Sequence, residues 1–225
     1  MKHKHALYPI LMSICAFICF LGVVILVADT VQPLWGRTML LLIPAVILCA
    51  VGLFALKGKL NRRKTVLLTT VLAIVLFVVS VFYFILLSIW TATTETTDIR
   101  YYDRAYDEID DEDGVKGIFP KVIPAFAADI SFSYTPQFLQ GGEVFELSYI
   151  TTDGDLSEWK SLLEKEAEWV GTNQQWHEEN SRSIPGPDLS TRYHLYWDGG
   201  FNHGEMCYVL IDEETNRITF YYSEW

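Results

Sequence analysis

Residues 65–94 read TVLLTTVLAIVLFVVSVFYFILLSIWTATT and contain no charged side chain. Two further uncharged windows precede this stretch, at Ala6 to Ala28 and at Thr38 to Leu56. A bilayer core about 30 Å thick is crossed by roughly 20 helical residues, whereas apolar runs of about 10 to 14 residues are typical of buried soluble helices. The sequence therefore predicts three transmembrane α-helices, at about residues 6–28, 38–56 and 66–90.

The first window has one alternative interpretation, a cleaved signal peptide ending near Ala28. The apolar region of a signal peptide is typically about 7 to 15 residues long, which is shorter than this window. Cys15 and Cys19 each follow an isoleucine, which argues against a lipoprotein cleavage site. We therefore expect the first helix to remain in the protein.

Charge divides the chain into two parts. Residues 1–94 carry a formal charge of +7 and residues 95–225 carry −18, for a total of −11. Phosphate binding needs clustered lysine and arginine, which the acidic part lacks. The division excludes a single soluble domain and a nucleic-acid binder built on a basic patch.

The basic residues also predict the orientation, because short cytoplasmic loops are enriched in lysine and arginine. The loop between the second and third windows, 57–64, holds five basic residues, whereas the loop at 29–37 holds only Arg37. We therefore expect the N-terminus inside and everything after about Thr94 outside. Trp35 and Trp90 fall at the predicted outer boundary, where tryptophan is enriched.

The second window carries small residues at helical spacing, which favours close helix packing in lipid. This predicted helix-packing face consists of Ala45, Cys49, Gly52 and Ala55. Pro44 lies early in the same window, where its ring and missing N–H are expected to kink the helix. No Asp, Glu, Lys, Arg or His lies within a window, so the spans are expected to anchor the protein or dock on another membrane protein rather than transport ions.

Residues 95–116 are predicted to form an acidic linker or stalk, with seven acidic residues between Asp103 and Asp113. The spacing does not fit an EF-hand, because counting back from Gly114 puts Pro120 at the position that needs glutamate. A solvated spacer is the main interpretation, and loose attraction of divalent cations is the alternative.

Residues 117–225 are predicted to form a small extracytoplasmic α+β domain. Alternating apolar residues indicate strands, and residues 155–171 combine a helical apolar stripe with Asp155 as a cap and Gly171 as a C-terminal stop. The expected order is β-β-α-β-β-β, which indicates an antiparallel sheet with one helix on a face. The expected strands lie at about 130–134, 145–149, 193–197, 206–211 and 218–222.

Cysteine usage suggests the compartment. Only Cys207 lies outside the spans, so the outer domain cannot form an internal disulfide, and it has no N-x-[ST] sequon. Secreted eukaryotic domains of this size often depend on disulfides. We therefore expect a bacterial plasma membrane, of the Gram-positive type with a single membrane.

The search for chemistry yields no catalytic, cofactor or metal motif. HEEN at His177 lacks the second histidine of H-E-x-x-H, and a zinc site from His194, His203 and Cys207 is not demanded by their spacing. A hydrolase using His194, His203 and Glu205 is the least favoured function. No cofactor is expected.

The domain is rich in aromatic residues, some of which are expected to be exposed for a glycan or protein partner. The candidate interaction surface consists of Tyr196, Phe201, Asn202 and Tyr221. The favoured function is a non-catalytic accessory, scaffold or sensory subunit of a membrane complex. The alternative is a tethered module that binds the cell wall or another extracellular ligand. The expected partners are the lipid bilayer and another membrane protein, with a cell-wall glycan as the alternative.

Overall fold

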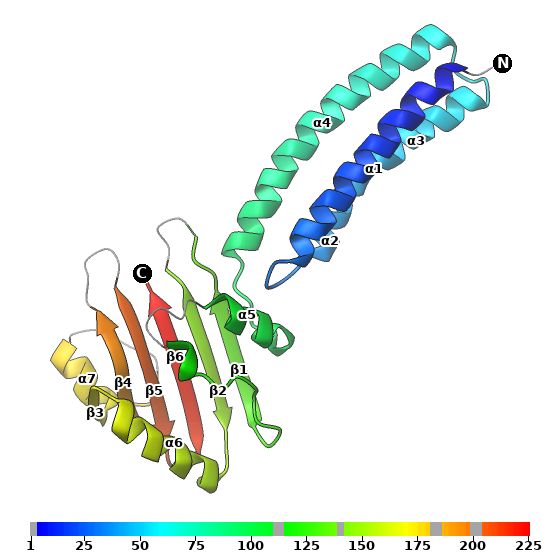
Figure 1. Ribbon diagram of the computed structural model, residues 1–225. Coiled ribbons are helices and arrows are strands. Elements are labelled where there is room, and N and C mark those ends of the chain that lie inside the picture. Colours follow the sequence, from blue (N-terminus) through cyan, green and yellow to red (C-terminus); the bar gives the residue numbers. More distant parts are fainter. Residues whose placement is uncertain (1–3, 110–114, 139–141, 181–185, 199–203) are drawn as a thin grey trace. The chain divides into compact units, whose positions relative to one another are not determined.

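The computed structural model describes residues 4–109, 115–138, 142–180, 186–198 and 204–225 (Figure 1). It divides into two compact units, the helix unit Met1–Ala92 and the C-terminal unit Thr93–Trp225. The division falls two residues before the boundary expected at Thr94.

The helix unit contains three helices that are long and apolar enough to cross a membrane, which indicates a multi-pass membrane protein. They are α1 (Leu7–Ala28), the run Trp35–Leu56, and α4 (Arg62–Thr93). A 3-10 turn, η1 (Lys4–Ala6), precedes α1. The prediction of three such helices is confirmed.

The second apolar run is not a uniform α-helix. It comprises α2 (Trp35–Thr38), the 3-10 segment η2 (Met39–Leu42) and α3 (Ile43–Leu56). Pro44 lies in the first turn of α3, where an N–H has no partner within an α-helix. Where a kink was expected, the structure therefore shows a change from 3-10 to α-helix immediately before Pro44.

Helix α3 packs closely on α1. A β-carbon added to Gly52 would lie 2.8 Å from Cγ1 of Ile10, so the missing side chain permits the approach. The Ser13 hydroxyl donates to the carbonyl oxygen of Ala45 at 2.7 Å. Helix α4 meets the other helices near both of its ends, through Tyr8 and Thr70 at one end and through Leu87 in an apolar cluster at the other.

The C-terminal unit is built on a six-stranded sheet in the order β1-β2-β6-β5-β4-β3, and every neighbouring pair is antiparallel. The strands are β1 (Ala128–Thr135), β2 (Val144–Ile150), β3 (Trp169–Thr172), β4 (Thr191–Asp198), β5 (Glu205–Asp212) and β6 (Arg217–Glu224). The antiparallel sheet is confirmed, and all five predicted strands belong to it.

One face of the sheet, the first face, holds the main aromatic core. Phe145, Leu147 and Phe220 are fully buried there. Helix α6 (Asp153–Glu166) covers this face, and the Trp159 ring lies 4.9 Å from that of Phe220. Figure 1 shows α5 and α6 on the same side of the sheet. The alternation of apolar residues along the strands therefore produces this core.

The segment expected to be a linker belongs to the C-terminal unit. It forms η3 (Ile99–Tyr101) and α5 (Tyr102–Glu108), followed by η4 (Val115–Gly117). Tyr102 is buried against Phe132 and Phe145, and its hydroxyl donates to the carbonyl oxygen of Pro120 at 2.6 Å. These contacts fix Tyr102, which precedes the acidic run, in the core of the C-terminal unit. Residues 110–114 of the acidic run lie outside the described residues.

The expected element order is wrong in one region. The helix ends at Glu166, and it is followed by strand β3 and helix α7 (Asn173–Asn180), which the predicted order lacks. Trp169 and Val170 pair with β4 instead of extending the apolar stripe. The cap is Thr152, whose side chain accepts from the N–H of Asp155. Aromatic and β-branched residues favour strands, and here pairing with β4 overrides the helical spacing.

Candidate functional site

The second face of the sheet gathers the chemically distinctive side chains of the C-terminal unit. Strand register places Arg192 opposite Leu210, His194 opposite Tyr208, and Tyr208 opposite Tyr221. Helix α7 packs near β3 and β4 and adds Asn173 and Trp176. We name the arginine cluster by its six members, Asn173, Trp176, Arg192, His194, Met206 and Tyr208.

Arg192 lies at the centre of the arginine cluster and is fully buried. Its Nε donates to Nε2 of His194 at 2.7 Å, and Nη1 donates to Oδ1 of Asn173 at 2.7 Å. The guanidinium carbon lies 3.5 Å from the ring centroid of Tyr208, a cation–π geometry. Burial lowers the pKa of Arg192 to about 10. Within the described ranges Arg192 forms no ion pair, so neutral acceptors and an aromatic ring stabilise its charge.

His194 is held in one protonation state by this arrangement. Its ring stacks on Trp176 with the centroids 3.4 Å apart. Burial, followed by the charge of Arg192, lowers the pKa of His194 to about 3. Because Nε2 accepts from Arg192, Nδ1 carries the proton, and Nδ1 is buried without a partner among the described residues.

This geometry supports a structural role for the arginine cluster. A general base needs a free lone pair within reach of the substrate, and the lone pair of His194 is occupied by Arg192. The same ring is 2% exposed, so a substrate has no direct access to it. Of the residues named for the hydrolase interpretation, His203 lies outside the described residues, and Glu205 begins β5 opposite Asp198 and Glu224.

The two described residues of the predicted interaction surface, Tyr196 and Tyr221, lie on opposite faces of the sheet. Tyr221 lies on the second face, where its ring stacks on Tyr208 at 4.7 Å. Tyr196 pairs with Cys207, which pairs in turn with Tyr222, and this register places Tyr196 on the first face. Phe201 and Asn202 lie outside the described residues.

A bulge explains the position of Tyr196. The register of β4 against β5 shifts between His194 and Tyr196. An extra residue in one strand reverses the alternation of every side chain beyond it. Uninterrupted alternation would have put Tyr196 on the second face with His194, which is what the sequence pattern predicts.

Helix α7 covers only one end of the second face. The strip on β1, β2 and β6 is polar and half-exposed or exposed, and we call it the open strip. It consists of Ser131, Ser133, Glu146, Thr219 and Tyr221. Burial, followed by the charge of Glu95, raises the pKa of Glu146.

The predicted helix-packing face is partly assembled. Ala45, Gly52 and Ala55 are buried in the helix unit, whereas Cys49 is exposed. Leu48, 3% exposed, occupies the buried position in that turn. The packed face of α3 therefore consists of residues 45, 48, 52 and 55 rather than 45, 49, 52 and 55.

Neither thiol chemistry nor metal binding is supported at the remaining candidates. Burial raises the pKa of the Cys207 thiol to about 12, so the thiol stays protonated. Among the described residues, no group of three or more His, Cys, Asp or Glu side chains could hold a metal ion.

Sequence reasoning did not identify Arg192, Asn173 and Trp176 as a unit. The available signal was the strand TRYHLYWD, which alternates Arg192 and His194 with Tyr193 on the opposite side. Charged or polar residues on one strand face usually indicate solvent, so only the presence of α7 reveals that this face is covered.

No protein-family model matches the chain, and neither a curated protein nor a solved structure matches it.

Proposed function

We propose that this protein is an accessory or scaffold subunit of a membrane complex, and that its C-terminal unit docks on a protein partner through the open strip. One observation carries the proposal: polar groups capable of catalysis are enclosed in the arginine cluster, while the open strip presents Glu146 and Tyr221 on the same rigid sheet. A half-buried carboxylate beside a tyrosine suits a contact in which the tyrosine is buried and a basic group of the partner pairs with the carboxylate.

The placement of the aromatic residues favours this proposal over glycan binding. A glycan surface needs several exposed aromatic rings on one face, and Tyr196 and Tyr221 lie on opposite faces. The Tyr221 ring is also partly engaged by Tyr208, with an interplanar angle of 21°. Tyr221 therefore supports a broader protein contact more readily than a sugar-stacking platform.

We further propose that the C-terminal unit lies outside the cell and that the loop 57–61 is cytoplasmic, in a bacterial plasma membrane. The opposite end of the helix unit carries an interfacial group: the Arg37 guanidinium lies 4.4 Å from the centroid of Trp90, and Tyr83 packs edge-on against that indole at 6.3 Å. Tryptophan and tyrosine favour the membrane–water boundary, and the loop excess of lysine and arginine favours the cytoplasm.

Cysteine labelling tests this orientation. Leu189 is 80% exposed in the C-terminal unit, and Lys59 is exposed in the loop 57–61. We expect Leu189→Cys to react with a membrane-impermeant maleimide on intact cells, and Lys59→Cys to react only after permeabilisation. The native protein gives the background: Cys207 is buried, and the exposed Cys15, Cys19 and Cys49 lie in apolar helices, where a water-soluble maleimide is not expected to reach them. Labelling of Lys59→Cys alone on intact cells would reverse the orientation.

Site-specific photo-crosslinking tests the docking surface in the full chain. Ser131 is exposed on the open strip, and Lys165 is exposed on α6 on the other side of the sheet. A photo-reactive amino acid at Ser131 should capture one protein partner, and the same group at Lys165 should not. Glu146→Lys should reduce capture from Ser131 by reversing the charge of the strip. Equal capture from both positions, or none from Ser131, would contradict docking at this surface.

A further inference from the structure

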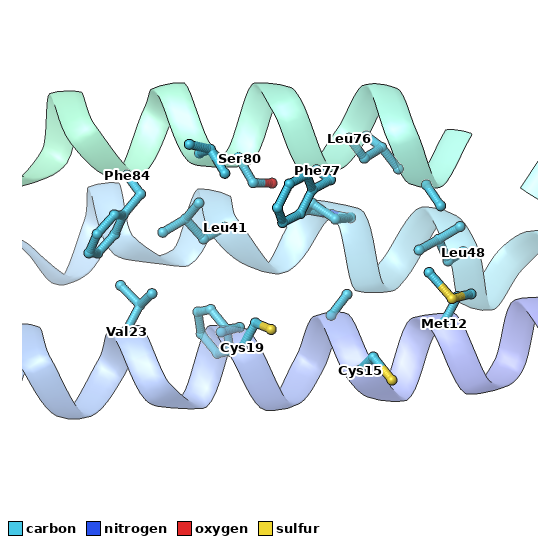
Figure 2. A pocket seen from close by; sticks show the side chains of 15 residues that line it. Met12, Cys15, Cys19, Val23, Leu41, Leu48, Leu76, Phe77, Ser80 and Phe84 are labelled. Carbon is cyan, nitrogen blue, oxygen red and sulfur yellow. The ribbon is translucent and has the colours of Figure 1, made fainter. Parts of the chain in front are cut away.

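An apolar pocket of about 280 Å³ lies within the helix unit, between α1, the η2–α3 segment and α4 (Figure 2). Helix α1 lines it with Cys19 and Val23, the second run with Leu41, and α4 with Phe77 and Phe84. Figure 2 shows these side chains between the three helices. The lining is almost entirely carbon, with Ser80 as a small polar residue on α4.

The pocket exists because α4 contacts its neighbours near its ends and carries small residues between them. At one end, the Tyr8 hydroxyl lies 3.3 Å from that of Thr70. At the other end, Leu87 belongs to a buried cluster with Phe20 and Val27 of α1. Ala73 and Ser80 face the intervening pocket, where larger side chains would close it.

A basic residue, Arg37, lies close in the sequence to residues that line one end of the pocket. Arg37 precedes the pocket-lining Leu41 by four residues, which is about one helical turn. The backbone oxygen of Arg37 accepts from the Tyr83 hydroxyl at 3.0 Å, and Phe84, the next residue, lines the pocket. In the part of the chain that the structure describes, the exposed Arg37 side chain forms no salt bridge.

We propose that this pocket binds one acyl chain of a phospholipid whose phosphate group is bound by Arg37. An apolar pocket without polar partners does not hold water, and at this depth of a bilayer the surrounding medium is hydrocarbon. Arginine binds phosphate through paired N–H donors, and Trp90 beside it favours the headgroup level. The apolar pocket and the Arg37 guanidinium together suit one amphipathic molecule, with an acyl chain in the pocket and a phosphate group on the arginine.

The chain position is tested with the full-length protein in vesicles that contain phosphatidylglycerol with a diazirine on one acyl chain. After irradiation, the crosslinks should concentrate on the pocket-facing side of 12–23 and 73–84. Ser80→Phe fills the pocket and should reduce these crosslinks at least about fivefold, which corresponds to a loss of about 1 kcal/mol of binding free energy. Ser88→Phe is the matched control, because Ser88 lies on the same helix, is exposed, and does not line the pocket.

Equal crosslinking of the Ser80→Phe and Ser88→Phe proteins would overturn the proposal, as would crosslinks spread evenly over all apolar faces. If Ser80→Phe fails to accumulate, Ala73→Leu makes a smaller filling change in the same pocket. Capture of a protein subunit by a photo-reactive residue at Ser80, with no retained lipid, would assign the pocket to a partner helix and overturn the lipid proposal.

The phosphate contact is tested by native mass spectrometry of the protein released from the same vesicles. The native protein should retain one phosphatidylglycerol molecule per chain. Arg37→Gln should lower the retained fraction of lipid severalfold. Arg63→Gln, which changes an exposed arginine at the start of α4, should leave that fraction unchanged. Equal losses in both variants would show non-specific attraction to anionic lipid and would refute the Arg37 contact.

Discussion

The two units use apolar residues in opposite ways. In α4, only 6% of the apolar window is buried within the protein, and Phe82 is 66% exposed. In the C-terminal unit, Phe145, Leu147 and Phe220 are fully buried. The helix unit therefore relies on a surrounding hydrocarbon solvent, whereas the C-terminal unit must build its own apolar interior.

A matched pair of phenylalanine substitutions gives the largest expected difference between the units. Phe220→Ala removes a ring packed against Phe119, Tyr149 and Trp159. Cavity formation should lower the free energy of unfolding of the C-terminal unit by about 3 to 5 kcal/mol. Phe82→Ala removes an equally large ring from an exposed position and should have little effect. Urea unfolding of the full chain in detergent, followed by tryptophan fluorescence, measures the Phe220→Ala variant, and unfolding of the helices in a titration with a denaturing detergent, followed by far-ultraviolet circular dichroism, measures the Phe82→Ala variant.

The comparison fails if Phe82→Ala destabilises the protein as much as Phe220→Ala. That result would mean that the exposed side of α4 packs on another part of the protein or on a second copy. Five of the seven tryptophans lie in the C-terminal unit, so the fluorescence transition reports mainly on that unit.

Acidification gives the next largest expected difference, because His194 of the C-terminal unit is buried and neutral, whereas His5, the histidine described in the helix unit, is only half-buried. Unfolded, His194 binds a proton below about pH 6.5; folded, its pKa is about 3. Between these values the unfolded chain binds more protons, so the stability conferred by His194 is complete above about pH 6.5 and is lost as the pH falls towards 3. Glu146, whose pKa is raised, contributes in the opposite direction.

The variant His194→Gln isolates this contribution, since glutamine can accept from Arg192 but does not titrate. We expect it to be less stable than the native protein at pH 7, where stacking on Trp176 is lost. We also expect its unfolding free energy to fall less steeply between pH 7 and about pH 4, by on the order of a few kcal/mol. Parallel pH profiles would show that His194 is already protonated or solvated in the folded protein.

Sequence patterns predicted those helices and strands in which a single environment, lipid or protein core, determines where apolar residues occur. The three apolar windows contain no charge because lipid surrounds them, and the predicted helices follow. The strands at 145–149 and 218–222 alternate because one side of each faces the core, and both appear as expected. In these segments one environment determines which residues are apolar, so the pattern alone identifies the element.

The candidate site was less predictable, because it depends on contacts between distant segments. The bulge beside Leu195 moves Tyr196 to the other face, and no local signal in the strand marks it. The 155–171 stretch has helical spacing throughout, yet Trp169 and Val170 pair with β4. Arg192 is buried only because α7 packs over it, and α7 was not expected. Each error arises where a partner element overrides local preference.

Glycine substitutions sharpen the comparison inside the helix unit. Gly52→Ala would place a β-carbon 2.8 Å from Cγ1 of Ile10, so α1 and α3 must separate or Ile10 must change rotamer. We expect a loss of about 1 to 2 kcal/mol of helix association, measured by thermal unfolding in detergent. Gly22→Ala is the matched control, because no atom lies within 4 Å of the added carbon. Equal effects of the two substitutions would mean that helix propensity, rather than packing, determines the result.

The smallest expected effect concerns how helices begin in the two units. Helix α6 starts at the surface, where the Thr152 side chain accepts from the N–H of Asp155, whereas Ala6, the residue before α1, provides no side-chain cap. Thr152→Ala should lower the unfolding free energy of the C-terminal unit by about 1 kcal/mol, because a backbone donor loses its acceptor. Ser157→Ala, an exposed change within α6, should cost less, since the Ser157 hydroxyl only donates to the carbonyl oxygen of Asp153 in the preceding turn. If the two losses are equal, the cap contributes no more than an ordinary surface hydroxyl, and the stability of α6 derives from its packing on the aromatic core.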